Sequence, residues 1–209
     1  MRKIGILGLV GVLTLVLAGC GGSSGPDLVV HDIISMGGAD DGYIGLDAVG
    51  YYTVFSSDAP NTIEVSDDPA NSRRGFISFS LSSIPLGATI SNATVFLPVL
   101  RATPVIGVPG VTILVDMVSF PSLSALTTQG QMASVYGATA ILLGPSLSIL
   151  PGDAGFDRTF NATDALNEAL NSGFSRLQVR LIASSGDVVF DDLLQVDNTG
   201  TPMLRVEYF

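Results

Sequence analysis

The sequence predicts an all-β protein folded as an antiparallel β-sandwich or barrel. Apolar residues recur at every second position in residues 76–81, 177–181 and 204–208, which is the period of a half-buried strand. Turn-forming residues such as Asp40-Asp41-Gly42 and Pro109-Gly110 separate short apolar runs. The pattern lacks the helices that a parallel α/β sheet would need between its strands, so a sandwich or barrel is favoured.

Eight further segments have the composition of strands. They are residues 28–35, 43–46, 51–56, 62–66, 89–100, 111–119, 138–143 and 187–191. A half-buried strand leaves its polar positions on the side away from the core. In the strand that begins at Arg176, this polar face contains Arg176, Gln178 and Arg180.

One helix is predicted over residues 163–171. Asn161 or Thr163 can cap its first turn, and Gly173 can end it in the left-handed conformation. Its apolar stripe contains Ala165, Leu166, Ala169 and Leu170. A second helix is expected near residues 122–134. Both are expected to cover an edge or an end of the sandwich.

Residues 1–19 have the features of a secretory signal peptide. Arg2 and Lys3 precede an apolar stretch, residues 4–17, which is followed by the small residues Ala18 and Gly19. The apolar stretch is shorter than the roughly 20 residues that a helix needs to cross a bilayer. A short buried helix is the alternative interpretation of this segment.

Leu17-Ala18-Gly19-Cys20 resembles the lipobox of bacterial lipoproteins. The resemblance implies cleavage before Cys20, the only cysteine of the chain, and attachment of lipid to its sulfur and its new amino terminus. Residues 20–27 then form the lipidated cysteine and a flexible linker of roughly 15 Å, and residues 28–209 form one domain. We expect a protein anchored at the bacterial cell envelope, and Gly21 implies the outer membrane if the host is Gram-negative.

The charge balance excludes some classes of partner. Cleavage before Cys20 would leave seven basic and nineteen acidic residues, a net charge of −12. Nucleic acid and anionic lipid headgroups bind basic surfaces, so neither is an expected partner of this chain. Calcium, neutral glycans and protein partners remain open.

Three stretches, taken in order, resemble the DNRLRE-domain proteins, a bacterial extracellular family of carbohydrate-binding-module-like jelly rolls. They are "RRGFISFSLSSIPLGATISNATVFLPV" at 73–99, "FNATDALNEALNSGFSRLQVRLI" at 160–182 and "TPMLRVEYF" at 201–209. The resemblance implies an antiparallel jelly-roll β-sandwich with one or two short helices. It also implies a module of a surface protein, and some such modules bind polysaccharide.

Aromatic rings beside hydrogen-bonding groups are typical of glycan sites, because the C–H face of a pyranose stacks on a π-face. The candidate ligand-binding residues are Tyr51, Tyr52, Arg73, Arg74 and Arg180. An arginine can bind a uronate carboxylate with two parallel hydrogen bonds. The alternatives are core packing for the tyrosines, and an ion pair with Asp67 or Asp68 for the arginines.

Acidic pairs in predicted loops are candidate ligands for a structural calcium ion, which takes six to eight oxygens. They are Asp40, Asp41, Asp191 and Asp192. Solvated turns are the alternative explanation for these residues.

Catalysis is not expected. His31 is the only histidine and Cys20 the only cysteine. The chain therefore lacks the residues that a typical zinc site, a Ser-His-Asp triad or a Cys-His pair requires. The predicted function is therefore a noncatalytic surface module that binds a glycan or serves in the cell envelope or extracellular matrix. An assembly protein with a protein partner, which the apolar run 105–118 would favour, is the alternative, and a polysaccharide-cleaving enzyme ranks below both.

Overall fold

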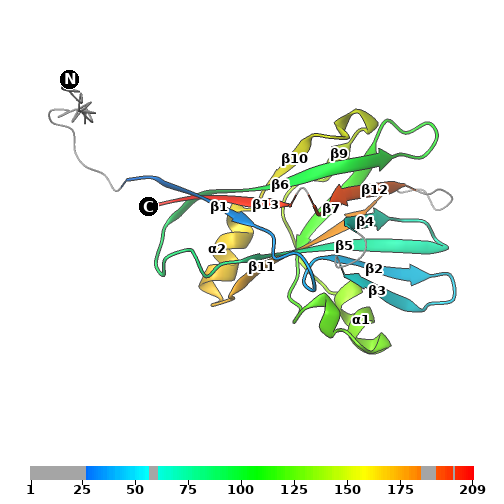
Figure 1. Cartoon of the computed structure of the whole chain (residues 1–209), viewed down its shortest axis with the longest axis horizontal. Coiled ribbons are helices and arrows are strands. Elements are labelled where there is room, and N and C mark those ends of the chain that lie inside the picture. Colours follow the sequence, from blue (N-terminus) through cyan, green and yellow to red (C-terminus); the bar gives the residue numbers. More distant parts are fainter. Residues whose placement is uncertain (1–26, 57–60, 185–191, 200) are drawn as a thin grey trace, which may run out of the picture.

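The computed structural model describes residues 27–56, 61–184, 192–199 and 201–209. These ranges contain thirteen strands, two α-helices and two 3-10 turns (Figure 1). Every strand pair in them is antiparallel. The predicted all-β antiparallel sandwich with two short helices is therefore confirmed.

The first layer of the sandwich is organised around one long strand, β6. Its first part pairs with β13 and β10, β13 pairs with β1, and its last part pairs with β12, which pairs with β4. The bounds are β1 Val29–Ile34, β4 Thr62–Ser66, β6 Ile90–Thr103, β10 Asp157–Asn161, β12 Leu193–Asp197 and β13 Met203–Tyr208.

The second layer has the order β3-β2-β5-β11-β7, and both β8 and β9 pair with β7. Its strands are β2 Gly42–Asp47, β3 Tyr52–Ser56, β5 Asn71–Ser80, β7 Val111–Met117, β8 Ile141–Leu142, β9 Leu147–Ile149 and β11 Arg176–Ala183. The two layers are joined where β4 turns into β5, at the pair Ser66 and Arg73.

A single large core fills the space between the layers. It includes Phe79 and Leu181 from the second layer and Val95 and Leu204 from the first, all fully buried. The layers approach closely at Gly75, where an added Cβ would lie 2.7 Å from a methyl carbon of Ile63. Only glycine fits at this point of β5 without displacing β4.

The second layer is also covered on its outer face. The 3-10 turn η1 (Leu123–Ala125) and helix α1 (Gln129–Tyr136) pack over a second apolar cluster, which contains Ile44, Phe76, Val118, Phe120, Leu123, Leu126, Val135 and Tyr136. Gln178 and Arg180 lie on this outer face and are buried. The prediction that β11 is half-buried was therefore wrong, because a segment more than 40 residues earlier in the chain covers its polar face.

Helix α2 spans Thr163–Asn171, as predicted. The side chain of Asn161 accepts a hydrogen bond from the Thr163 N–H at 2.9 Å, and Gly173 adopts φ +71° just after the helix. Thr163 instead accepts a hydrogen bond from the Ala93 N–H, which ties α2 to β6. The second helix, predicted near 122–134, is divided between η1 and α1.

Most strand predictions are confirmed within two or three residues. The expected strand at 138–143 is reduced to β8, and the expected strand at 187–191 lies outside the described residues. The sequence did not predict β9, β10 or β12. No helix among the described residues is long and apolar enough to cross a membrane.

The sandwich has two distinct ends (Figure 1). We call one the tether end, because the chain enters the fold there at residue 28. It consists of residues 28–30, the β5–β6 loop (81–89), the α2–β11 loop (172–175) and residues 208–209. The far end carries the β2–β3 turn, the β4–β5 turn and the β6–β7 loop.

Candidate functional site

Arg73 and Arg74 lie next to each other in β5 and therefore point to opposite faces of the sheet. The Arg73 guanidinium donates to the Glu64 carboxylate at 2.5 Å, and Gln195 donates to the other oxygen of Glu64 at 2.8 Å. The Arg73 guanidinium also lies 5.9 Å from the centre of the Tyr43 ring. Arg73 is thus engaged by β4 rather than by Asp67 or Asp68.

Arg74 faces helix α1 on the other side of the sheet. Its guanidinium lies 4.1 Å from the centre of the Tyr136 ring and donates to the Tyr136 carbonyl. Burial lowers the pKa of this guanidinium. Arg74 is therefore partly buried and joins β5 to the end of α1.

Arg180 holds the same end of α1. Its side chain is only 3% exposed and forms two hydrogen bonds with Asp116 of β7, at 3.0 and 2.6 Å. It also donates to the carbonyls of Val135, Tyr136 and Ala138. These contacts stabilise the covering segment, and they leave the guanidinium away from the surface where a glycan would bind.

The predicted calcium ligands are in separate surroundings. Asp40 forms an ion pair with Arg176 at 2.8 Å. Asp41 is fully buried and accepts hydrogen bonds from the N–H groups of Ser78 and Gly37. Burial raises the pKa of the Asp41 carboxyl.

Asp192, from the other acidic pair, lies near the end of β6. Asp192 is buried and accepts a hydrogen bond from the Val105 N–H at 2.6 Å. Asp191 and the predicted lipidation site Cys20 lie outside the described residues. Among the residues that are described, no three His, Cys, Asp or Glu side chains form a group that could hold a metal.

Tyr51 and Tyr52 do line a shared surface feature. A groove of about 480 Å³ runs between strand β3 and the η1–α1 segment. It is lined by Tyr51, Tyr52, Thr53, Val54, Ser56, Leu123, Ser124, Leu126, Thr127, Gln129 and Met132. None of these side chains carries a charge. The groove therefore combines aromatic surface with hydroxyl and amide groups.

Local contacts fix the two tyrosines in this groove. The Asp47 carboxylate accepts a hydrogen bond from the Tyr51 N–H at 2.8 Å and so orders the β2–β3 turn. Gln129 forms two hydrogen bonds with the backbone of Tyr52, both at 2.7 Å. The Tyr52 ring packs edge-on against Tyr136, whereas the Tyr51 side chain is 58% exposed. Tyr51 is the ring available to a ligand.

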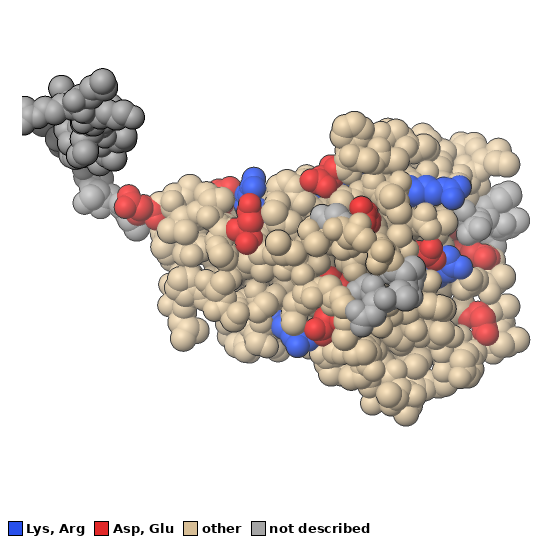
Figure 2. All heavy atoms as spheres, viewed as in Figure 1, with Lys and Arg blue, Asp and Glu red and all other residues tan. Residues whose placement is uncertain are grey.

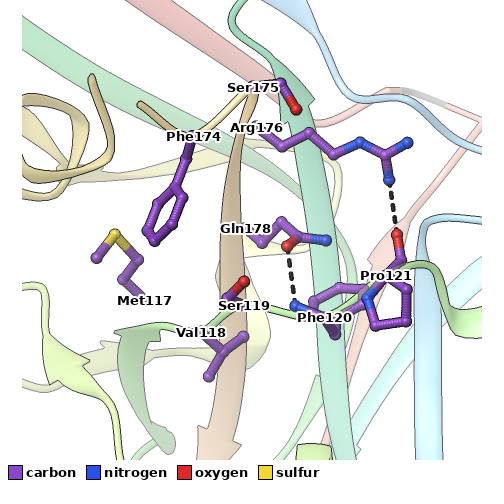
Figure 3. Close-up of a pocket in the computed structure, with 9 residues that line it drawn as sticks. All are labelled: Met117, Val118, Ser119, Phe120, Pro121, Phe174, Ser175, Arg176 and Gln178. Carbon is purple, nitrogen blue, oxygen red and sulfur yellow. Dashed lines mark hydrogen bonds between the residues drawn. The ribbon is translucent and has the colours of Figure 1, made fainter. Parts of the chain in front are cut away.

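A second hollow, of about 310 Å³, lies between β7 and the start of β11 (Figure 3). Phe174 and Met117 form one side, and Arg176 and Pro121 form the other. Arg176 donates to the Pro121 carbonyl at 3.0 Å, and the Gln178 side chain accepts from the Phe120 N–H at 3.0 Å. Its polar groups are thus largely engaged in holding the 118–121 segment.

The sequence did not indicate several residues of these two hollows. Gln129, Thr127 and Phe174 give no signal as single residues, because only long-range packing brings them to the lining of these hollows. The run Tyr51-Tyr52 beside a turn was the signal that the sequence offered for the groove. Comparison with protein-family models gave no match, and comparison with curated proteins gave no significant match.

Proposed function

We propose that this chain is a lipid-anchored surface protein of the bacterial cell envelope, and that its sandwich is a noncatalytic module that binds a neutral glycan. The glycan lies in the groove beside β3. The observation that carries the proposal is the exposed ring of Tyr51 at the edge of an uncharged groove lined with hydroxyl groups.

The chemistry of the groove supports a sugar ligand. A pyranose presents a C–H face that stacks on an aromatic ring and hydroxyl groups that need donors and acceptors. Tyr51 offers the ring, and the exposed Ser124 and Thr127 offer hydroxyl groups. Arg73 and Arg74 are engaged by Glu64 and Tyr136, and no Lys or Arg lines the groove, so a uronate carboxylate has no cationic partner there. A neutral glycan is therefore favoured over a uronate-rich one.

The lipid anchor rests on the lipobox-like Leu17-Ala18-Gly19-Cys20 and the short linker after it. Tyr51 follows the β2–β3 turn at the far end of the sandwich, opposite the point where the chain enters the fold (Figure 1). A protein held at Cys20 would thus present its groove away from the membrane. This arrangement suits a protein that binds an extracellular or envelope polysaccharide.

Binding of residues 27–209 to a panel of neutral and uronate-rich polysaccharides tests the proposal. This fragment contains every residue of the core between the layers. The assay is run with calcium and with a chelator, so that it also tests the calcium prediction at Asp40, Asp41, Asp191 and Asp192. Saturable binding to a neutral glycan supports the module, whereas no binding in either condition contradicts it for the glycans in the panel.

The second candidate function is assembly with another protein. It is favoured by Ile106 in the β6–β7 loop and Val49 in the β2–β3 turn, whose side chains are almost fully exposed. The rest of the apolar run 105–118 is mainly core, because Val111, Ile113 and Val115 point between the layers. An oligomer in size-exclusion chromatography would favour assembly, and a monomer would favour the glycan module.

A further inference from the structure

We infer that the tether end of the sandwich rests directly on the lipid bilayer that holds Cys20, with Leu86 and Phe174 inserted among the lipids. The inference rests on the proposed lipid anchor and adds an orientation to it. The partner that contacts this apolar surface is thus the membrane rather than a protein.

Large apolar side chains are exposed together at this end. Leu86, in the β5–β6 loop, is fully exposed, and Phe174, in the α2–β11 loop, is 44% exposed. The other exposed apolar residues of this end are Leu28, Val29, Val30 and Phe209. Residues of this kind on one surface mark a site of contact with a protein or a membrane.

These residues belong to one continuous surface. Leu86 and Phe174 line the same hollow of about 380 Å³ between their two loops. Backbone hydrogen bonds in both directions join Thr89 to Phe209, and Val29 pairs with Tyr208. The β5–β6 loop is therefore flanked by Phe174 on one side and by the start of β1 and the end of β13 on the other.

The same surface carries little charge. Residues 28–30, 81–89, 172–175 and 208–209 contain no Asp, Glu, Lys or Arg, and the charged residues directly next to them in the chain are Asp27, Glu207 and Arg176. The turns of the far end, in contrast, carry Asp47, Asp67 and Asp68. On the face in view in Figure 2, the tether end is drawn mostly tan, with red atoms at its outermost point. With the tether end down, the acidic loops point away from the anionic headgroups of a bacterial membrane.

The linker is short enough to enforce this contact. Only residues 21–27 separate Cys20 from Leu28, and a flexible chain of this length spans roughly 15 Å on average. A fold held so near the bilayer must turn some surface toward it. Apart from Asp27 at the end of the linker, the surface that surrounds the attachment point is the one with few charges.

Site-specific fluorescence tests the orientation in the full lipidated protein. Because Cys20 is the only cysteine and is consumed by lipid in the proposed anchor, Leu86→Cys adds one free thiol for an environment-sensitive dye. The matched control is Ile106→Cys, another almost fully exposed apolar loop residue, which lies beyond the opposite end of β6. Each labelled protein is reconstituted in phosphatidylcholine vesicles, alone and mixed with phosphatidylglycerol.

We expect the dye at position 86 to shift to shorter wavelength and to be quenched by nitroxide-labelled lipids in both kinds of vesicle. The dye at position 106 should remain in water. A dye at position 86 that stays in water, while the protein still floats with the vesicles, would overturn the inference and leave the anchor intact. A shift seen only with anionic lipid would also overturn it, since it would indicate attraction to charge. Protein that does not float, with an unmodified Cys20 in mass spectrometry, would overturn both the anchor and this inference.

Discussion

Arg180 of β11 and Asp116 of β7 form a buried ion pair with two hydrogen bonds, at 3.0 and 2.6 Å, on the outer face of the second layer. The remaining donors of the guanidinium bind the carbonyls at the end of helix α1. Through these hydrogen bonds, the Arg180 side chain connects β7 and β11 to the segment that covers them. Removing either partner would leave the other as an unpaired buried charge.

We predict that Arg180→Met lowers the free energy of unfolding by about 3–5 kcal/mol, since Asp116 would lose its partner and three carbonyls near the end of α1 would each lose a hydrogen bond. Chemical denaturation measures the change. Arg158→Met is the control, because Arg158 pairs with Asp153 on the surface at 3.5 Å, and its loss should cost about 1 kcal/mol or less. Equal costs for the two variants would contradict the structural role of Arg180.

A second prediction concerns pH and the buried Asp41. The pKa of its carboxyl is raised in the folded protein, mainly by burial. At pH values between the ordinary pKa of 3.8 and the raised pKa of the folded state, the folded protein therefore binds more protons than the unfolded chain. The contribution of Asp41 to stability is therefore fully present below pH 3.8 and is lost as the pH rises through the folded pKa.

The variant Asp41→Asn tests the direction of this pH dependence of stability. It cannot titrate, and its single side-chain oxygen can serve only one of the two N–H donors, Ser78 and Gly37, so we expect a loss of about 1–3 kcal/mol. The loss should be largest at low pH and should diminish as the pH rises. Urea unfolding of both proteins from pH 3.5 to 7 checks this, and a loss that grows with pH would contradict it.

Glycine-to-alanine substitutions at two positions should have opposite effects. Gly75→Ala places a Cβ 2.7 Å from Ile63 and 3.0 Å from Val65, so we expect a loss of about 1–3 kcal/mol from overpacking. Gly130→Ala adds a Cβ to helix α1 with nothing within 4 Å, and should stabilise by about 0.5–1 kcal/mol. Thermal unfolding of both variants gives the comparison. If Gly75→Ala left the stability unchanged, the layers would be able to separate at this point with little loss of stability.

The last prediction locates the glycan. Tyr51→Ala should weaken binding of a neutral glycan by about tenfold or more, which corresponds to about 1.4 kcal/mol, whereas Tyr51→Phe keeps the ring and should retain most of the affinity. Phe174→Ala is the control, because Phe174 lines the hollow of Figure 3 and not the groove. Titration calorimetry measures all three. A larger loss for Phe174→Ala than for Tyr51→Ala would move the site to that hollow.

The sequence predicted those parts of the fold that depend on local pattern. Helix α2 was predicted at its exact bounds, because an apolar stripe, a capping asparagine and Gly173 all lie within about a dozen residues. Alternation in β11 correctly placed Leu177, Val179 and Leu181 on the core side. Such signals are carried by neighbouring residues.

Long-range packing could not be predicted in the same way. A period of two shows that Gln178 and Arg180 share a face, but it does not show whether another segment covers that face. The covering helix α1 buries only Val135 and Tyr136 from its own length, so its sequence gives a weak signal. For the same reason the pair Arg73-Arg74 resembled a binding site, although each arginine is engaged by a different segment on its own side of β5.

The pairing of β1 with β13 also has a mechanical consequence. In the proposed anchored state, a pull on a bound glycan at the far end is resisted at Cys20, and the force enters the fold along the axis of β1. Six residue pairs, from Val29 with Tyr208 to Ile34 with Met203, connect this strand to the sheet. Because the force runs parallel to the strand, these pairs are sheared together and share the load, whereas a force across the strand would peel them apart one by one.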